Sequence, residues 1–85
     1  MKFVFSKHAA EQMFRRGISQ EQALSVLLQP EEILTENGVD IFQSIIEESG
    51  QKFLLRVFVN TNQFPKVVVT LYKTTKINKY YEGKI

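Results

Sequence analysis

The sequence predicts an α+β fold in which two N-terminal helices pack on one face of an antiparallel sheet. Two observations predict it: the apolar residues recur with a helical period up to about residue 29, and with a period of two from residue 31 to residue 74. With a short strand before the helices, the element order reads β-α-α-β-β-β-β. A chain of 85 residues, 44% of them hydrophobic, is expected to form a single domain over residues 1–85.

The N-terminal elements are predicted from their caps. Residues 3–5 alternate as a short strand does, and Ser6 then suits the N-cap of a helix that ends at Arg16, before Gly17 in a left-handed conformation. A second helix follows, beginning at a capping box and ending before Pro30. The expected buried stripe of the first helix comprises its apolar side chains: Ala9, Ala10, Met13 and Phe14.

Turn signals divide the second half of the chain into four strands. Asn37-Gly38 is typical of a two-residue hairpin turn, and Ser49-Gly50 marks the next turn. A loop ending at Pro65 precedes the last strand. The expected strands cover residues 31–36, 39–47, 52–60 and 66–74.

The strand registers predict two different faces. Pairing across Ser49-Gly50 places Gln43 opposite Arg56, on a face separate from that of Phe42 and Val57. The apolar face, which the helices should cover, contains Phe53, Leu55, Val57, Val59, Val67, Val69 and Leu71. The other face is expected to be open, with a polar centre and apolar margins: Leu34, Ile41, Gln43, Leu54, Arg56, Phe58, Val68, Thr70 and Tyr72.

Composition excludes several classes of site. The absence of cysteine excludes disulfides, thiolate nucleophiles and cysteine-based zinc sites, and a single histidine argues against a histidine-based metal site. The four glycines are too far apart for a phosphate-binding glycine loop, so we expect no metal and no cofactor. No stretch is typical of a signal peptide or a membrane span, and we expect a cytoplasmic protein without a membrane partner.

Charge is segregated along the chain although the net charge is only +2. Residues 1–20 carry +3, residues 21–48 carry −7 and residues 66–85 carry +4, counting Lys and Arg against Asp and Glu. If the two ends meet in space, the protein has a basic side that suits a polyanion. The alternative is a surface of scattered, solvated charges.

Arg56 interrupts the apolar run FLLRVFV, where a buried guanidinium requires a partner. It either reaches solvent or pairs with Gln43 or a carboxylate, or else it grips a phosphate. Thr70 and Tyr72, its expected neighbours, could add hydroxyl donors to such a site or could belong to an ordinary half-exposed sheet surface.

Basic residues near both ends of the chain form two further groups. His8, in the first turn of the first helix, is either a neutral general base or a surface histidine, and Arg15 lies on the same face with Arg16 beside it. Near the C-terminus, lysines three residues apart precede two tyrosines, a pattern that suits single-stranded nucleic acid or a solvated terminal strand: Lys73, Lys76, Lys79, Tyr80 and Tyr81.

The stretches SKHAAEQMFRRGIS, QPEEI and VVVTLYKTTKINKYY, with Arg56 on a central strand, resemble a small bacterial family of unassigned function. Its members share a His, then Arg-Gly-Ile-Ser, then Pro-Glu, and a terminal Thr-hydrophobic-Tyr-Arg/Lys-Thr strand. That family is in turn similar to the RelE, ParE and BrnT group of toxin components. The likeness implies a RelE-like fold, with two N-terminal helices over an antiparallel sheet.

Resemblance to the ribonuclease members implies a metal-independent endoribonuclease in which the ribose 2′-hydroxyl attacks its own phosphate. RNA would be the substrate and a small acidic antitoxin the partner. The resemblance implies His8 for proton transfer, Arg56 and Arg16 as phosphate clamps, and Tyr72 or Lys73 as auxiliary donors. The candidate catalytic residues are His8 and Arg56, and the candidate substrate-binding residues are Arg15, Arg16, Gln43, Thr70, Tyr72, Lys73 and Lys76.

Two other functions remain open, because members of the same fold group act by binding a protein target. One is a non-enzymatic module that holds nucleic acid or protein on the open sheet face. The other is a homodimer that buries an exposed apolar row: Leu34, Ile41, Leu54, Phe58 and Val68.

Overall fold

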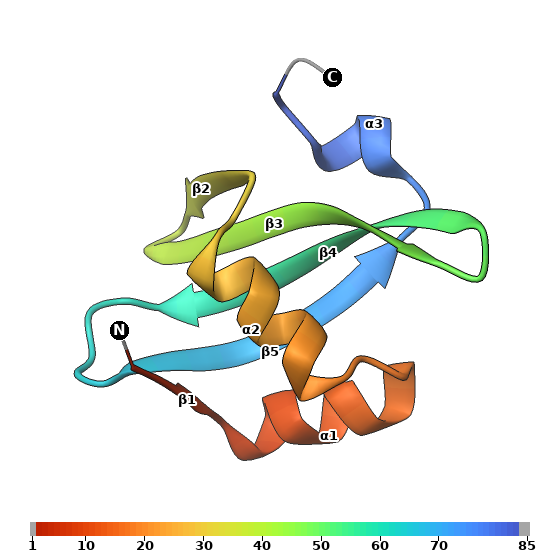
Figure 1. Cartoon of the computed structure of the whole chain (residues 1–85). Coiled ribbons are helices and arrows are strands. Elements are labelled where there is room, and N and C mark those ends of the chain that lie inside the picture. Colours follow the sequence, from red (N-terminus) through yellow and green to blue (C-terminus); the bar gives the residue numbers. More distant parts are fainter. Residues whose placement is uncertain (1, 84–85) are drawn as a thin grey trace.

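A computed structural model, which describes residues 2–83, confirms the α+β class (Figure 1). The elements are β1 (Phe3–Phe5), α1 (Lys7–Arg16), α2 (Gln20–Leu28), β2 (Glu32–Glu36), β3 (Val39–Glu48), β4 (Gln51–Asn60), β5 (Lys66–Thr74) and α3 (Ile77–Tyr80). The strands form one sheet in the order β1-β5-β4-β3-β2. No helix among the described residues is long and apolar enough to cross a membrane.

The sheet is mixed, whereas a wholly antiparallel sheet was expected. β2 to β5 pair antiparallel, but β1 pairs parallel to β5 over residues 66–68. β1 is connected to the rest of the sheet through the helix pair, so no hairpin turn sets its direction. Beyond residue 68, no strand of the described chain pairs with the outer side of β5.

The predicted helix ends are confirmed. The Ser6 hydroxyl accepts a hydrogen bond from the Ala9 amide at 3.0 Å, and Gly17 ends α1 with a φ of 64°. Ser19 and Gln22 form the expected capping box of α2. Local hydrogen bonding therefore fixes both helices within one residue of their predicted bounds.

The buried face of α1 differs from the predicted stripe. Ala9 is fully buried and Met13 packs against the core, but Ala10 is exposed and Phe14 is 90% exposed. α1 packs mainly against β5 and β1, at one edge of the sheet, so a narrow strip of the helix is covered. The helix is rotated so that Arg16, at its C-terminal end, lies next to β5.

α2 crosses the sheet over β3 and β4, as Figure 1 shows, and covers the face predicted to be apolar. The buried core on this face draws on both helices and three strands: Ala9, Ile18, Ala23, Val26, Leu27, Phe42, Leu55, Val57, Val59, Val68 and Leu71. The β3–β4 register is as predicted, with Phe42 opposite Val57 and Gln43 opposite Arg56.

A β-bulge corrects the predicted register of β5. Phe58 pairs with Thr70 but Val59 pairs with Val68, so Val69 is an extra residue on β5. Val68 is therefore fully buried in the core, whereas Val67 and Val69 were the residues expected there. A bulge shifts the alternation by one residue, and nothing in the run VVV marks its position.

The second face of the sheet is not open, contrary to expectation. The chain turns back after β5, and Tyr80, the last residue of α3, contacts the side chains of Gln43 and Arg56. Ile41 and Leu54 on this face are fully buried. The exposed apolar row expected for a homodimer is therefore wrong for Ile41, Leu54 and Val68.

Candidate functional site

Arg56 is buried at the centre of β4, with only 4% of its surface exposed. Its Nε donates to the side-chain oxygen of Gln43 at 2.8 Å, and its Nη1 donates to the Tyr72 hydroxyl at 2.7 Å. The ring of Tyr80 covers the guanidinium, with its centroid 4.3 Å from Cζ. The sequence left three alternatives for Arg56, namely solvent, an internal partner or a phosphate, and in the structure Arg56 pairs internally with Gln43.

The charge of Arg56 is compensated through a relay. The Gln43 amide donates to the Glu32 carboxylate and to the Tyr80 carbonyl, and the Glu82 amide also donates to Glu32, at 2.8 Å. Gln43 is fully buried. The expectation that Arg56 and Gln43 stand on an open face is wrong, because both side chains are buried and hydrogen-bonded within the protein.

A different arginine lies at the free edge of β5. Arg16, the last residue of α1, donates from Nη1 to the Leu71 carbonyl at 3.2 Å, and its Cζ lies 5.9 Å from the centroid of the Tyr72 ring. A shallow pocket of about 580 Å³ opens there. We call it the Arg16 pocket; it is lined by Arg16, Phe53, Tyr72, Lys73 and Thr74.

The two cations of the Arg16 pocket differ in whether a carboxylate neutralises their charge. Lys73 forms an ion pair with Glu48 at 2.5 Å, the only salt bridge within residues 2–83. The hydrogen bond from Lys73, and a weaker one from Gln22, hold the pKa of Glu48 below its ordinary value. Arg16 has no carboxylate partner in the described part of the chain. The positive charge available to a ligand is therefore that of Arg16.

Tyr72 links the exposed arginine to the buried one. The Cζ atoms of Arg16 and Arg56 lie 5.9 and 5.8 Å from the centroid of its ring. Because the Tyr72 hydroxyl accepts a hydrogen bond from Arg56, its own proton is directed elsewhere and can be donated to another acceptor. The pocket thus combines a guanidinium fork with a polarised phenol.

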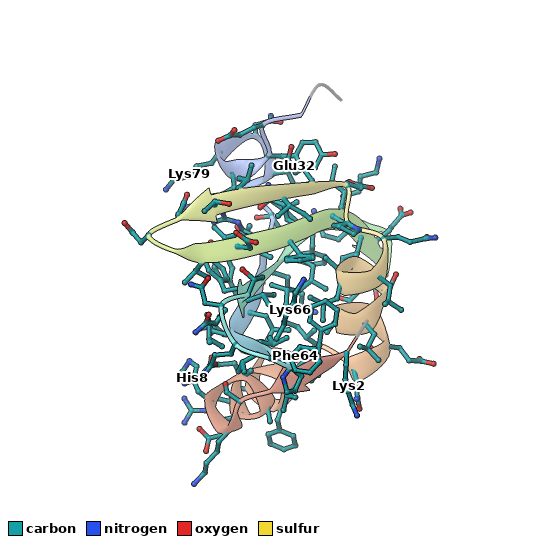
Figure 2. The ribbon with its side chains drawn as sticks, turned by 90° about the vertical axis from the view of Figure 1, so that its left-hand side faces the viewer. Lys2, His8, Glu32, Phe64, Lys66 and Lys79 are labelled. Atoms are coloured by element: carbon teal, nitrogen blue, oxygen red, sulfur yellow. The ribbon has the colours of Figure 1, made fainter. Side chains whose placement is uncertain are left out.

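His8 is exposed on the first turn of α1 and does not line the Arg16 pocket. Eight residues separate it from Arg16, which corresponds to about 12 Å along the helix axis. Figure 2 shows His8 at the opposite end of the molecule from Glu32 and Lys79. The structure does not bring His8 together with Arg56 and its relay.

The remaining predicted residues are dispersed. Arg15 points into a separate pocket of about 480 Å³ on α1, which Lys7 and Phe14 also line. Thr70 pairs with Phe58, away from the lining of the Arg16 pocket. Within residues 2–83, no three histidine, aspartate or glutamate side chains are grouped as a metal site would require.

Lys76 belongs to a third pocket, of about 550 Å³, between the sheet and α3. We call it the lysine pocket; it is lined by Ile45, Lys52, Thr75, Lys76, Ile77, Asn78 and Lys79. Sequence analysis missed Lys52, which lies on β4 and meets the C-terminal lysines only because the chain turns back after β5. Their spacing grouped Lys73 with Lys76 and Lys79, but Lys73 is turned toward α1 and Glu48.

Residues 5–77 match the family described as "Domain of unknown function (DUF4258)". The chain belongs to this family. The match covers nearly all of the described fold and confirms the resemblance to a family of unassigned function, while the likeness to the toxin group stays a prediction. No curated protein and no solved structure matches the chain.

Proposed function

We propose that this DUF4258 protein binds RNA through the phosphate backbone, with one phosphate held in the Arg16 pocket. The observation that carries the proposal is the Arg16 guanidinium, which has no carboxylate partner within residues 2–83 and lies beside the hydroxyl-bearing side chains of Tyr72 and Thr74. A planar guanidinium binds a phosphate through two parallel hydrogen bonds, and hydroxyl groups can donate to the remaining oxygens.

Arg16 also has a structural role, which leaves donors for a ligand. Its Nη1 satisfies the Leu71 carbonyl at the free edge of β5, and a cation at the end of α1 complements the helix dipole. Within residues 2–83, Nε and Nη2 of Arg16 make no hydrogen bond. Two of its three nitrogens are therefore available to a phosphate, and RNA as the polyanion is supported by the resemblance of the sequence to ribonuclease toxins.

Adjacent arginines provide a matched test. Arg16→Gln and Arg15→Gln remove the same charge from neighbouring exposed positions, but only Arg16 lines the Arg16 pocket. With a fluorescently labelled single-stranded RNA at low salt, we expect Arg16→Gln to weaken binding about tenfold and Arg15→Gln less than threefold, since a hydrogen bond to a charged group is worth about 1.5–3 kcal/mol. Equal losses in the two variants would contradict the proposal.

A second candidate function, cleavage of the bound RNA, is favoured by the hydrogen bond between Arg56 and Tyr72. In this reaction the 2′-hydroxyl oxygen forms a bond to phosphorus, the bond from phosphorus to the 5′-oxygen breaks, and the 2′-hydroxyl proton passes to water. Tyr72 would donate its proton to the departing 5′-oxygen and then regain a proton from water, and Arg16 would stabilise the charge on the phosphorane.

Cleavage is tested with purified protein and RNA in EDTA, together with cell growth on induction. We expect Tyr72→Phe to abolish cleavage and to weaken RNA binding less than Arg16→Gln does, because one hydroxyl donor is lost while the ring and Arg16 remain. His8→Ala should leave cleavage unchanged. If the wild-type protein leaves RNA intact, this second candidate is contradicted and the binding function remains. If His8→Ala loses cleavage and Tyr72→Phe does not, the proton-transfer residue is His8 rather than Tyr72.

A further inference from the structure

We infer that the lysine pocket is a second phosphate subsite of the same surface, so that the ligand is a nucleic-acid strand long enough to enter both pockets. The inference rests on the proposed function, and it names residues that the Arg16 pocket does not contain. Its principal residues are Lys52 on β4 and Lys76 next to α3.

The lysine pocket concentrates positive charge. Three lysines from two distant segments line it, together with Thr75 and Asn78, which can donate hydrogen bonds. Among residues 2–83, no carboxylate lines it. Glu47 stands opposite Lys52 in the β3–β4 ladder, yet no ion pair joins them in the described structure. Like charges brought together without a carboxylate repel each other, and a bound anion relieves that repulsion.

The two pockets are neighbours along the chain. Thr74 lines the Arg16 pocket and Thr75 lines the lysine pocket, and consecutive Cα atoms are about 3.8 Å apart. The Thr74 hydroxyl accepts a hydrogen bond from the Lys76 amide at 3.0 Å, which fixes the backbone between them. A continuous polyanion can therefore pass from Arg16 over the end of β5 to Lys52 and Lys76.

The nature of these contacts defines the ligand. Both pockets offer cations and hydroxyl or amide donors, which recognise phosphate groups without reading bases. A single phosphate or a mononucleotide fills only one pocket, whereas an extended strand fills both.

The test compares two charge-matched double variants by titration with labelled oligonucleotides. Lys52→Gln with Lys76→Gln alters the lysine pocket, and Lys2→Gln with Lys7→Gln removes the same charge elsewhere. Lys79 is left in place because its Nζ lies 5.3 Å from the centroid of the Tyr80 ring, and its loss could disturb α3. The probes are a dinucleotide and a ten-nucleotide single strand, each as RNA and as DNA.

For the ten-nucleotide RNA we expect the Lys52/Lys76 variant to bind about tenfold more weakly and the plot of log K against log salt to become shallower by about 1.4, from two lost single-strand phosphate contacts. The dinucleotide should bind both variants alike. Similar losses in the two double variants, or an equal loss with the dinucleotide, would overturn the inference.

The outcomes separate this inference from the proposed function. If RNA affinity falls in Arg16→Gln but not in the Lys52/Lys76 variant, the proposed function stands and the second subsite is contradicted. The reverse pattern keeps a phosphate site in the lysine pocket and removes the Arg16 proposal. No binding by the wild type removes both. Tighter binding of RNA than of DNA assigns the ligand to RNA, and equal binding assigns it to the shared phosphodiester backbone.

Discussion

At the scale of single residues, the sequence position of Arg56 suggests a ligand contact more strongly than that of Arg16, whereas in the structure it is Arg16 that lines a pocket. Arg56 stands in an apolar strand, where a guanidinium must be paired, and the structure pairs it internally with Gln43 and Tyr72. Arg16 stands at a helix end, an ordinary place for a cation, but its charge has no carboxylate partner among residues 2–83. Arg56, whose burial is energetically costly, has a structural role, and Arg16, at an ordinary position for a cation, lines the pocket.

Arg56→Ala should therefore reduce stability. Truncation leaves a cavity and removes the donors to Gln43 and the Tyr72 hydroxyl, which together should lower the free energy of unfolding by about 2–4 kcal/mol. Urea denaturation measures this loss. RNA affinity under conditions where the variant is folded should change less than threefold. A variant that stays as stable as the wild type but loses RNA binding would assign Arg56 to the ligand.

Glu48 predicts a pH dependence with a defined sign. Its pKa is lowered in the folded protein by the hydrogen bonds from Lys73 and Gln22, so the unfolded chain takes up the proton first. The resulting stabilisation is complete above the ordinary pKa, near 4.5, and is lost as the pH falls through the lowered value. The stability advantage of the wild type over Glu48→Gln should shrink as the medium is acidified.

The adjacent glutamate supplies the control for this titration. The Glu47 side chain makes no hydrogen bond or ion pair among the described residues, so Glu47→Gln should show no such convergence with the wild type. Unfolding measured in urea at a series of pH values below 6 compares the three proteins. An advantage over Glu48→Gln that grows toward low pH would contradict the assigned sign.

At the scale of elements, α1 shows that hydrophobicity alone does not fix which side of a helix is buried. Its four apolar residues predict one stripe, but packing against the sheet edge selects Ala9 and Met13 and leaves Phe14 in solvent. This rotation is also what places Arg16 beside β5. The location of the Arg16 pocket thus depends on the buried face of α1.

Neighbouring positions on α1 test that rotation. Met13→Ala should destabilise the protein by about 2 kcal/mol, because Met13 packs against the core. Phe14→Gln should change stability by less than about 0.5 kcal/mol, because the ring is exposed. Thermal or urea unfolding distinguishes them. A large loss on Phe14→Gln with none on Met13→Ala would restore the stripe predicted from sequence.

Elements defined by local chemistry were predictable, and those defined by distant contacts were not. Ser6, Gly17 and the turns at Asn37-Gly38 and Ser49-Gly50 act through adjacent backbone groups, so helix ends, hairpins and the β3–β4 register follow from sequence. The parallel pairing of β1, the bulge at Val69 and the four-residue α3 depend on the rest of the fold. Short helices carry too few residues to show a period.

At the scale of the whole molecule, the candidate surface is assembled where separate parts of the chain meet. The end of α1 supplies Arg16, β5 supplies Tyr72, and the return of the chain through α3 joins Lys76 to Lys52. The same return covers Arg56 with the ring of Tyr80. The sequence showed that both ends of the chain are basic, but which cations share a pocket depends on the path after β5.

The most direct measurement of the central claim is the location of bound phosphate by NMR. A titration of the isotopically labelled protein with single-stranded RNA should shift the Arg16 side-chain Nε–H signal and the backbone amide signals of Tyr72, Lys73 and Thr74. Signals from His8 and Arg15 should stay in place. Shifts confined to the first turn of α1, with no change at Arg16, would contradict the account.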